Sequence, residues 1–371
     1  MRYHVVGIGG AGMSAVARIL LARGHDVSGS DTGHWPLADA LARDGATVHD
    51  RFAPEHVSGA DIVIRSSAYK EDNSEVRAAL ERGIPVWKRE DAWRELARGQ
   101  RVVAVAGTHG KSTTTALTWL AIRRGGIDAS LICGAALRDV GSNAHAGRDP
   151  LLVIEADEYD HAFLALEPDV AVVTTVDHDH VDLFPTAAAY RAEFEAFVLR
   201  IVAGGTLVHS ADDPGARALG EWARSRGEIR VVAYGALDGE LALRGAHNAR
   251  NAAAALAAAA CVGADAARAD AAVRAFAGVE RRLEPLGSAG GIRVIDDYAH
   301  HPAEIAAGID AYGEGAVVVF QPHTPSRLAA FFDEFVTVLR RPRAVVIVET
   351  FRSAREAADP HGRARALADA V

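Results

Sequence analysis

The chain has 371 residues, of which 49% are apolar and 24% charged, as in ordinary globular proteins of two or three domains. Its formal net charge of −9 disfavours general nucleic-acid binding but leaves a locally held nucleotide ligand open. The two cysteines lack metal-ligand spacing, no signal peptide precedes the first expected strand, and no apolar run reaches the ~18 residues of a membrane helix. These features predict a protein of the reducing cytoplasm with small-molecule ligands and without nucleic-acid or membrane partners, and they leave its oligomeric state open.

The first 98 residues alternate strand-like apolar runs with helical patterns, which predicts a doubly wound domain around a parallel sheet. The expected strands cover 3–7, 25–30, 62–66 and 84–87, and the expected helices cover 12–22, 37–44 and 73–82. A G-x-G-x-x-G loop over 7–12 follows the first strand, and Asp31 follows the second. This is the fingerprint of dinucleotide sites, but the same loop also binds other phosphates or serves close packing.

A second phosphate-binding pattern opens the next α/β unit, where the apolar run 102–106 leads into a glycine turn and a helical stretch. In such a loop the backbone N–H groups and the helix dipole attract phosphate, the lysine adds a point charge, and the serine hydroxyl suits Mg²⁺. The pattern is shortened, because Val105 stands where the first glycine of G-x-x-x-x-G-K-[ST] belongs. A nicotinamide-dependent dehydrogenase built on the first loop would leave this second loop without a role. The residues expected at the nucleotide are Gly107, Thr108, His109, Gly110, Lys111, Ser112 and Thr113.

Two acidic motifs follow strand-like runs of this unit. The expected strands cover 151–155, 171–175 and 206–209. E-A-D-E-Y-D over 155–160 places Glu155 where a carboxylate can hold Mg²⁺ on a nucleotide. D-H-D-H-V-D over 177–182 could hold a metal or orient a substrate, and the absence of a nearby cysteine favours Mg²⁺ over zinc. The alternative for each motif is a solvated acidic turn.

Three polar motifs complete the pattern. H-N-A-R-N over 247–251 opens an alanine-rich helix expected over 248–261, where the asparagines either cap the helix or face an adenine edge. D-D-Y-A-H-H-P over 296–302 and F-Q-P-H over 320–323 stand at strand ends of a third α/β unit, where ligands bind in open sheets. That unit is expected to have strands over 292–296, 316–321 and 344–348 and helices over 302–311 and 326–339.

The order of these motifs resembles the Mur ligase family, the ATP-dependent amide-forming enzymes of peptidoglycan synthesis. The motifs that carry the resemblance are G-I-G-G-A-G-M-S (7–14), G-S-D (29–31), S-S-A (66–68), G-T-H-G-K-S (107–112), E-A-D-E-Y-D (155–160), D-H-V-D (179–182), H-N-A-R-N (247–251), R-R (281–282), D-D-Y-A-H-H-P-A-E (296–304) and F-Q-P-H (320–323). The resemblance implies an α/β protein of three domains. These are a Rossmann-like UDP-sugar-binding domain over 1–98, a central P-loop ATPase domain over 99–286, and a truncated Rossmann-like, amino-acid-binding domain over 287–371.

Within the family, the chain is most similar to the branch that joins L-alanine to UDP-N-acetylmuramate, with ATP and Mg²⁺ as cofactors and an acyl phosphate as intermediate. An alternative branch recycles a murein tripeptide and shares E-A-D-E-Y-D, but it typically carries F-E-P-R where this chain has F-Q-P-H over 320–323. No lysine follows Lys111, so the carbamylated lysine of the later Mur ligases is not available. The implied activity belongs to cell-wall biogenesis, and with it to cell shape and division.

The resemblance also implies a role for each matching residue. The catalytic residues would be Lys111, Glu155, His180 and His323. Ser112 and Glu155 would hold one Mg²⁺, and His180 a second. Beyond the phosphate loop, the nucleotide would contact His247, Asn248, Asn251, Arg282 and Asp297. The UDP-sugar would lie on Gly9, Gly12, Ser14, Asp31 and Ser67, and the amino acid on Tyr298, His300, His323 and Arg327.

Departures from the family pattern leave a second hypothesis open, a homologue that binds nucleotides or UDP-sugars without ligating them. Thr175 replaces a usual asparagine, and Pro325 replaces a usual aromatic residue. Only nine residues separate Gly235 from Gly245, too few for the usual hairpin. The chain also ends at Val371, where family members generally continue, so we expect a small third sheet.

Overall fold

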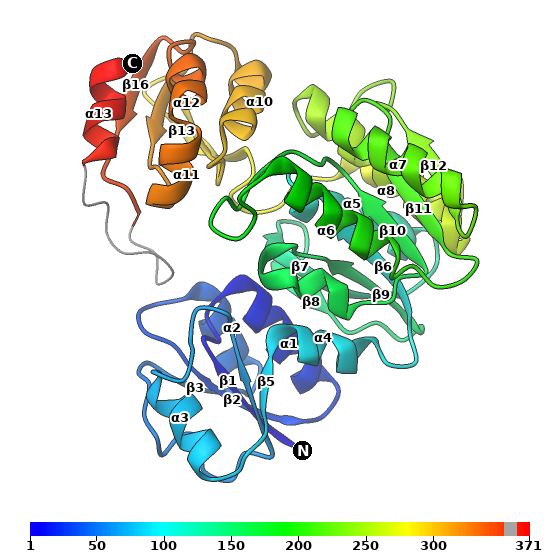
Figure 1. The fold of residues 1–371 in the computed structure, drawn as a ribbon, viewed down its shortest axis with the longest axis vertical. Helices are drawn as coiled ribbons and strands as arrows, with labels where there is room; N and C mark the ends of the chain where they lie inside the picture. Colours follow the sequence, from blue (N-terminus) through cyan, green and yellow to red (C-terminus); the bar gives the residue numbers. More distant parts are fainter. Residues whose placement is uncertain (352–361) are drawn as a thin grey trace.

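Three α/β domains follow one another along the chain in the computed structural model, which describes residues 1–351 and 362–371. The central domain adjoins the N-terminal domain on one side and the C-terminal domain on the other (Figure 1). No helix among the described residues is both long enough and apolar enough to span a membrane.

The N-terminal domain is built on a five-stranded parallel sheet with the strand order β3-β2-β1-β4-β5. Its elements are β1 (Arg2–Val6), α1 (Ala11–Ala22), β2 (Asp26–Ser30), α2 (Pro36–Arg43), β3 (Thr47–His49), β4 (Ile62–Arg65), α3 (Ser74–Glu81) and β5 (Val86–Lys88). The expected doubly wound order is confirmed. The edge strand β3 is not predicted, because three half-exposed residues are too few to show an apolar pattern.

The central domain is built on a seven-stranded sheet with the order β12-β11-β10-β6-β9-β7-β8, in which β8 runs antiparallel to β7. Its elements are α4 (Arg89–Ala97), β6 (Arg101–Ala106), α5 (Lys111–Arg124), β7 (Ser130–Leu137), β8 (Ser142–His145), β9 (Leu151–Glu155), η1 (Tyr159–Ala165), β10 (Val170–Val173), α6 (Ala187–Val198), β11 (Thr206–Ser210), α7 (Pro214–Arg226), β12 (Arg230–Tyr234), α8 (Ala246–Val262) and α9 (Ala266–Ala275). The sequence patterns do not predict β7, β8, β12 or α9. The connection 235–245 contains no helix or strand.

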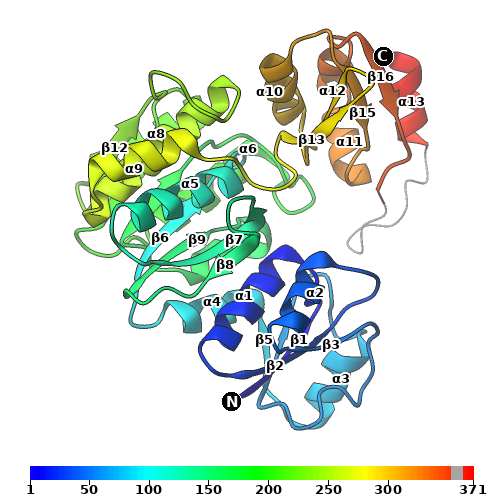
Figure 2. The ribbon, with the colours of Figure 1, turned by 180° about the vertical axis from the view of Figure 1, so that it is seen from behind.

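Alternate side chains of β6 enter two different cores, as a strand with both faces covered requires. Val103 and Val105 pack in a cluster with α5, α8 and α9, which lie together in Figure 2. Val102 and Ala104 pack in a second cluster with α1, α6 and α7. This second cluster continues without a break from the N-terminal domain into the central domain. The two domains therefore share one core, which fixes them against each other.

The C-terminal domain contains two small sheets. The strands β13 (Glu284–Ala289) and β14 (Ile292–Asp296) form an antiparallel hairpin, and β15 (Val317–Phe320) and β16 (Ala344–Ile347) form a parallel pair. The strand expected over 292–296 is confirmed, but it pairs with β13 and not with the other two expected strands, so the expectation of one small sheet is wrong. Gly290 and Gly291 both have positive φ, the backbone of a tight hairpin turn, and they return the chain onto β13.

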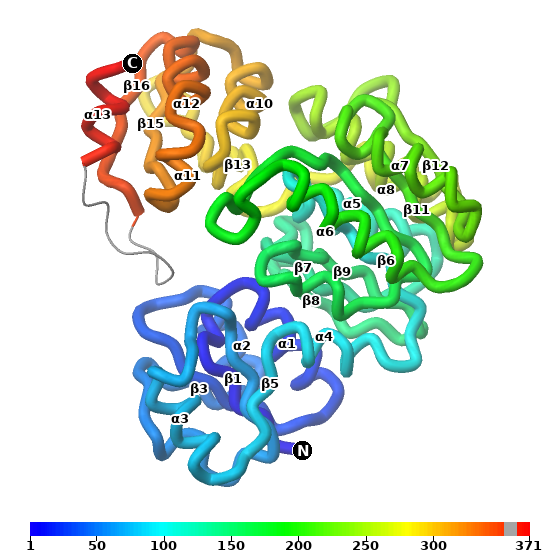
Figure 3. Tube along the Cα trace, viewed as in Figure 1, coloured from blue at the N-terminus to red at the C-terminus, as the bar shows by residue number. Residues whose placement is uncertain are grey.

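The helices of this domain are α10 (Pro302–Tyr312), α11 (Pro325–Ala330), α12 (Phe332–Leu339) and α13 (Arg363–Ala370). The single helix expected over 326–339 is thus two, because Phe331 leaves helical geometry with ψ +29°. Phe320 and Phe335 pack in a core under the parallel pair, while Val317 and Val319 face outward. The chain enters the domain through the segment after α9, which is yellow in Figure 3.

The edge of the central sheet that carries the site is fixed by strand order. β10, β6 and β9 are neighbours and run parallel, so their carboxyl ends lie side by side. The phosphate loop follows β6, the first acidic motif begins at Glu155 in the last position of β9, and residues 174–177 follow β10. Ligands of open α/β sheets bind at this edge.

Candidate functional site

The phosphate loop over 107–110 has a backbone that only glycine accommodates easily. Gly107 has φ +133°, and a side chain there would collide with Thr174. Gly110 has φ +77° and precedes α5 as its N-cap. No side chain caps α5 among the described residues, so the N–H groups of its first turn are left for a ligand. The loop therefore has the backbone of an anion site.

Lys111 reaches back over this loop to a buried carboxylate. Its Nζ lies 3.0 Å from Glu158 Oε2 and donates to the carbonyl oxygens of Gly107 at 2.5 Å and Thr108 at 3.1 Å. Burial disfavours the charged amine, but the charges of Glu158 and Asp157 outweigh burial and raise the pKa of Lys111 above its usual value. The lysine is thus a fixed positive charge beside the phosphate site.

A first group of oxygen ligands lies where α5 meets β9. Ser112 Oγ donates to Glu155 Oε1 at 3.0 Å, and Glu155 Oε2 accepts the backbone N–H of Gly134 at 2.6 Å. A hydroxyl and a carboxylate next to a phosphate loop fit Mg²⁺, which prefers hard oxygen ligands and is usually held by few protein groups. These residues would hold the first Mg²⁺ expected from the sequence.

His180 belongs to a second group, separate from Glu155. The ligand atoms of Asp157, Glu158 and His180 all lie within 4.8 Å of one another. His180 has φ +49°, a left-handed backbone that a histidine adopts only when its surroundings impose it. Burial alone would raise the pKa of Asp157, but nearby cations, first Arg89 and Lys111, lower it to about 2. His180 was expected at a second Mg²⁺, whereas Asp157 and Glu158 were not predicted as its companions, although both stand in E-A-D-E-Y-D.

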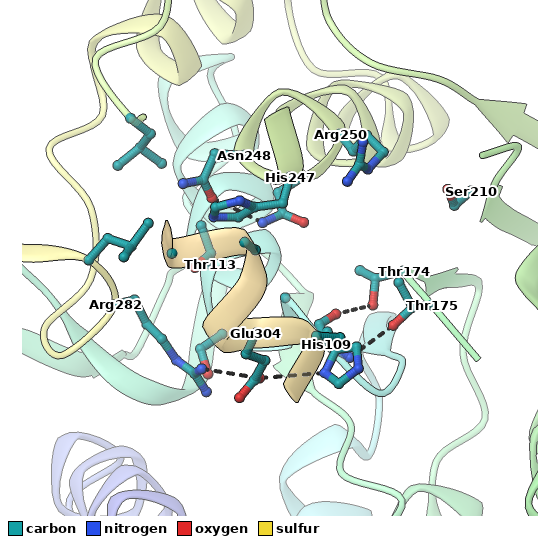
Figure 4. A pocket seen from close by; sticks show the side chains of 18 of the residues that line it. His109, Thr113, Thr174, Thr175, Ser210, His247, Asn248, Arg250, Arg282 and Glu304 are labelled. Atoms are coloured by element: carbon teal, nitrogen blue, oxygen red, sulfur yellow. Dashed lines mark hydrogen bonds and ion pairs between the residues drawn. The ribbon is translucent and has the colours of Figure 1, made fainter. Parts of the chain in front are cut away.

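A cavity of about 280 Å³ opens beside the phosphate loop, between the central and C-terminal domains (Figure 4). Most of the residues expected to bind the nucleotide line it, namely His109, Gly110, Ser112, Thr113, His247, Asn248, Asn251, Arg282 and Asp297. They come from α5, α8 and the segments around β13 and β14, which are far apart in the sequence. The fold therefore brings these expected ligands into one place.

The two asparagines of α8 do not cap their helix, so the capping alternative is wrong. Gly245 is the N-cap and makes no side-chain cap. Asn248 Nδ2 donates to the carbonyl of Arg244 at 2.7 Å, and Asn251 Nδ2 donates to Asn248 Oδ1 at 3.1 Å. The pair is fixed on the face of α8 that lines the cavity.

The C-terminal domain contributes a carboxylate that was not predicted from the sequence. Glu304 of α10 lies between His109 and Arg282, as Figure 4 shows, with its Oε1 3.6 Å from His109 Nδ1 and 3.4 Å from Arg282 Nη1. Burial opposes a charge on His109, but the carboxylates of Asp177, 3.5 Å from Nε2, and of Glu304 raise its pKa to about 9. Nearby Asp297 is half-buried, and desolvation raises its pKa to about 6 against the opposing charge of Arg282.

The residues expected to bind the amino-acid substrate also lie close together. The ring centroids of Tyr298 and His300 are 5.2 Å apart, and those of His300 and His323 are 5.6 Å apart. Arg327 lies beside them with Nη1 donating to the His323 carbonyl at 3.4 Å. Its Nε and Nη2 donate to both carboxylate oxygens of Asp179, at 2.9 and 3.0 Å. A buried bidentate pair thus ties α11 to the D-H-V-D motif of the central domain.

The residues expected at the UDP-sugar lie in the N-terminal domain, and none of them lines the cavity. Asp31 Oδ2 accepts the N–H of Gly9 at 2.9 Å, and its Oδ1 accepts the hydroxyl of Tyr69 at 3.3 Å. The carboxylate therefore holds the glycine loop itself. Gly12 and Ser14 lie in the first turn of α1, and Ser67 lies in the turn after β4.

Comparison with known proteins covers the same three parts of the chain. Residues 2–101 match the Mur ligase family catalytic domain, 105–241 the Mur ligase middle domain, and 281–371 the Mur ligase glutamate ligase domain. The UDP-N-acetylmuramate–L-alanine ligase of Roseiflexus sp. strain RS-1 is 41% identical over 419 aligned residues, which cover 100% of this chain and 89% of the relative. The protein of the same name from Nocardioides sp. strain ATCC BAA-499 is 44% identical, covering 100% of this chain and 85% of the relative.

Solved structures agree in fold. The UDP-N-acetylmuramate–alanine ligase of Thermotoga maritima has a TM-score of 0.81 at 27% identity, covering 100% of this chain and 88% of that chain. A murein peptide ligase from Psychrobacter arcticus has a TM-score of 0.74 at 24% identity, covering 93% and 84%, which shows the shared fold. With all three domains matched in order and relatives above 40% identity over the whole chain, this protein belongs to the Mur ligase family.

Proposed function

We propose that this chain is an ATP-dependent ligase that joins L-alanine to UDP-N-acetylmuramate in peptidoglycan precursor synthesis. The observation that carries the proposal is the cavity beside the phosphate loop, where the expected nucleotide ligands of two domains meet. Next to it lie the Ser112–Glu155 pair and the group of Asp157, Glu158 and His180, which would each fit a divalent cation. A cluster of aromatic and histidine side chains lies there too. The substrates are those that the relatives' names give. The division into 1–98, 99–286 and 287–371 remains a prediction.

The first step of the proposed reaction is phosphoryl transfer. A carboxylate oxygen of the muramoyl group attacks the γ-phosphorus of ATP, the bond to the ADP oxygen breaks, and an acyl phosphate forms. Lys111 and the amides of α5 would neutralise charge on the transferred group. Mg²⁺, when bound by Ser112 and Glu155, would supply charge neutralisation and orientation of the phosphates. Asn248 and Asn251, which line the same cavity, would hold the adenine edge.

The second step is acyl transfer to the amino acid. The amine nitrogen attacks the acyl carbon, and the tetrahedral intermediate loses phosphate as the amide forms and the nitrogen gives up a proton. Burial lowers the pKa of His300 to about 4, so this ring is neutral at pH 7 and can accept a hydrogen bond from an ammonium or amine. Tyr298, His323 and Arg327 would enclose a small amino acid around it. Positioning in this enclosed space would account for much of the rate.

Release of inorganic phosphate from Mg-ATP tests the proposal. UDP-N-acetylmuramate is supplied with L-alanine, glycine, L-serine or murein tripeptide in separate reactions. We expect release that needs both the UDP-sugar and L-alanine, with a new amide product of matching mass. Release that needs the tripeptide instead would move the chain to the recycling branch. ATP binding without release in any reaction would favour the homologue that binds without ligating.

A further inference from the structure

One arginine lies between two sites that are distant in the sequence. Arg89 is the first residue of α4, the helix that leads into the central domain. Its Nη2 donates to Asp157 Oδ2 at 2.9 Å, and its side chain is 18% exposed. Its Cδ and Nη1 lie 3.3 Å from the place that a Cβ on Gly12 would occupy. The guanidinium therefore reaches from the second cation group to the glycine loop of the N-terminal domain.

The position of this side chain is fixed by packing. The Cζ of Arg89 lies 4.5 Å from the ring centroid of Trp93, which is buried one turn later in the same helix. Among the residues that the structure describes, Asp157 is the only hydrogen-bond partner of this guanidinium. Because an arginine has five N–H donors, the edge that faces Gly12 is left for another anion.

The first N–H groups of α1, next to that edge, have no side-chain acceptor among the described residues. No side chain within the described ranges caps this helix, so its first N–H groups and its dipole favour an anion. Asn143 of β8 is fully buried there, and its Nδ2 donates to the Ala11 carbonyl at 2.7 Å and to Ser14 Oγ at 3.1 Å. Its Oδ1 is buried without a partner in the described part of the chain. A buried amide oxygen without a donor is costly, and a hydroxyl or N–H of a bound sugar would satisfy it.

We propose that Arg89 binds the diphosphate of the UDP-sugar at the amino end of α1 and, with the same guanidinium, positions Asp157 of the second cation group. The inference rests on the proposed function, which places the UDP-sugar on Gly12 and Ser14. The planar fork of arginine can serve both anions, since one edge takes the carboxylate and another takes phosphate oxygens. A diphosphate that shares this positive charge leaves Asp157 more negative toward a cation. Sugar nucleotide and Mg²⁺ therefore strengthen each other's binding.

Direct binding without ATP tests the first half of the proposal. Calorimetry measures the Kd of UDP and of UDP-N-acetylmuramate for the wild type, Arg89→Gln and Arg89→Lys. The matched control is Arg94→Gln, which removes a 60% exposed arginine from the same helix. We expect Arg89→Gln to weaken both ligands equally, by roughly tenfold to a hundredfold, the effect of one charge-assisted hydrogen bond. Arg89→Lys should recover part of the loss, and the control should match the wild type.

Two results would overturn this assignment. Unchanged affinity for both ligands in Arg89→Gln would remove Arg89 from the site. A loss for UDP-N-acetylmuramate alone would mean that Arg89 binds the muramoyl carboxylate and not the diphosphate. The proposed function fails separately, if the wild type binds the UDP-sugar normally but releases no phosphate in the ligase assay.

The effect of Mg²⁺ on UDP-N-acetylmuramate binding tests the second half. In the wild type, Mg²⁺ should lower the Kd of the UDP-sugar. Arg89→Gln and Asp157→Asn should each abolish this effect of Mg²⁺ on the Kd. In the double variant, Mg²⁺ should likewise leave the Kd unchanged. A purely structural arginine would weaken binding but leave the Mg²⁺ effect intact, and that result would overturn the positioning role. Thermal unfolding shows whether each variant is folded. If Arg89→Gln does not fold, Arg89→Lys, which keeps the positive charge, takes its place in the test.

Discussion

The Nδ1 of His109 and the Oε1 of Glu304 lie 3.6 Å apart across the boundary between the central and C-terminal domains. His109 stands in the phosphate loop, and Glu304 stands in the first turn of α10. The same carboxylate lies 3.4 Å from Arg282 on the segment that joins the two domains. One acidic residue therefore links the phosphate loop to the domain that carries the expected amino-acid site.

This relationship predicts a loss of stability at alkaline pH. Burial opposes a charge on His109, but Asp177 and Glu304 outweigh it and raise the pKa of His109 from 6.5 to about 9. The stabilisation is complete below pH 6.5 and disappears as the pH rises through about 9. The shift corresponds to about 3 kcal/mol in total. Thermal unfolding from pH 6 to 10 should show this drop in the wild type and not in His109→Asn.

The control for this experiment is His34→Asn, which alters a histidine whose side chain is 83% exposed. Its stability should follow the wild type at every pH. An equal alkaline drop in the wild type and in His109→Asn would show that His109 is neutral in the folded protein.

Replacing Lys111 should separate catalysis from stability. Lys111→Met removes the charge beside the phosphates, and we expect phosphate release to fall by roughly a hundredfold to a thousandfold. It also leaves Glu158 buried without its lysine partner, which should cost about 3 to 5 kcal/mol of unfolding free energy. The double variant Lys111→Met/Glu158→Gln should recover much of the stability but none of the activity.

Lys70→Met, at an exposed position, is the control for Lys111. It should leave both phosphate release and unfolding unchanged. Near-normal turnover in Lys111→Met would contradict the role assigned to the phosphate loop.

The two groups of cation ligands should respond separately to Mg²⁺. Glu155→Gln alters the group with Ser112, and His180→Asn alters the group with Asp157 and Glu158. Each variant should need more Mg²⁺ for half-maximal phosphate release, and the two effects should add in the double variant if the sites are independent. Titration of phosphate release against Mg²⁺ measures this. A Mg²⁺ requirement like that of the wild type in both single variants would show that neither group holds the ion.

The pair of Arg327 and Asp179 should be sensitive to acid. Burial raises the pKa of Asp179, but the charges of His180 and Arg327 hold it well below its usual value. Its stabilising contribution is therefore present above about pH 4 and is lost as the pH falls further. Asp179→Asn should lower the unfolding free energy at pH 7 by about 3 to 5 kcal/mol, because Arg327 stays buried without its partner. It should also raise the KM for L-alanine more than it changes kcat.

Asp182→Asn is a matched control for Asp179, since Asp182 belongs to the same motif and is exposed. It should change the acid stability little. If Asp179→Asn left both acid stability and the KM for L-alanine unchanged, the ion pair would have no role in holding α11 at the site.

Much of the fold could be predicted because its main strands carry long apolar runs. β6 and α5 are separated by a glycine turn, so the sequence showed both the apolar pattern of each element and the boundary between them. The missing elements lack such signals. β8 is a four-residue strand that reads S-N-A-H, and its partner is chosen by tertiary contact with β7 and α1. The strand over 292–296 was expected in one small sheet with β15 and β16 but pairs with β13, because a single strand pattern does not reveal its neighbour.

The family, the phosphate-loop pattern and most of the expected nucleotide ligands could be predicted from the sequence alone, because these depend on residue types at short, fixed spacings. Which charges far apart in the sequence meet was settled by the packing of the folded chain. Glu304 joins His109, Asp157 joins Arg89, and Asp179 joins Arg327 over separations of 68 to 195 residues. Such pairs leave no local pattern, since their energy depends on burial and distance after the sheets and helices have packed.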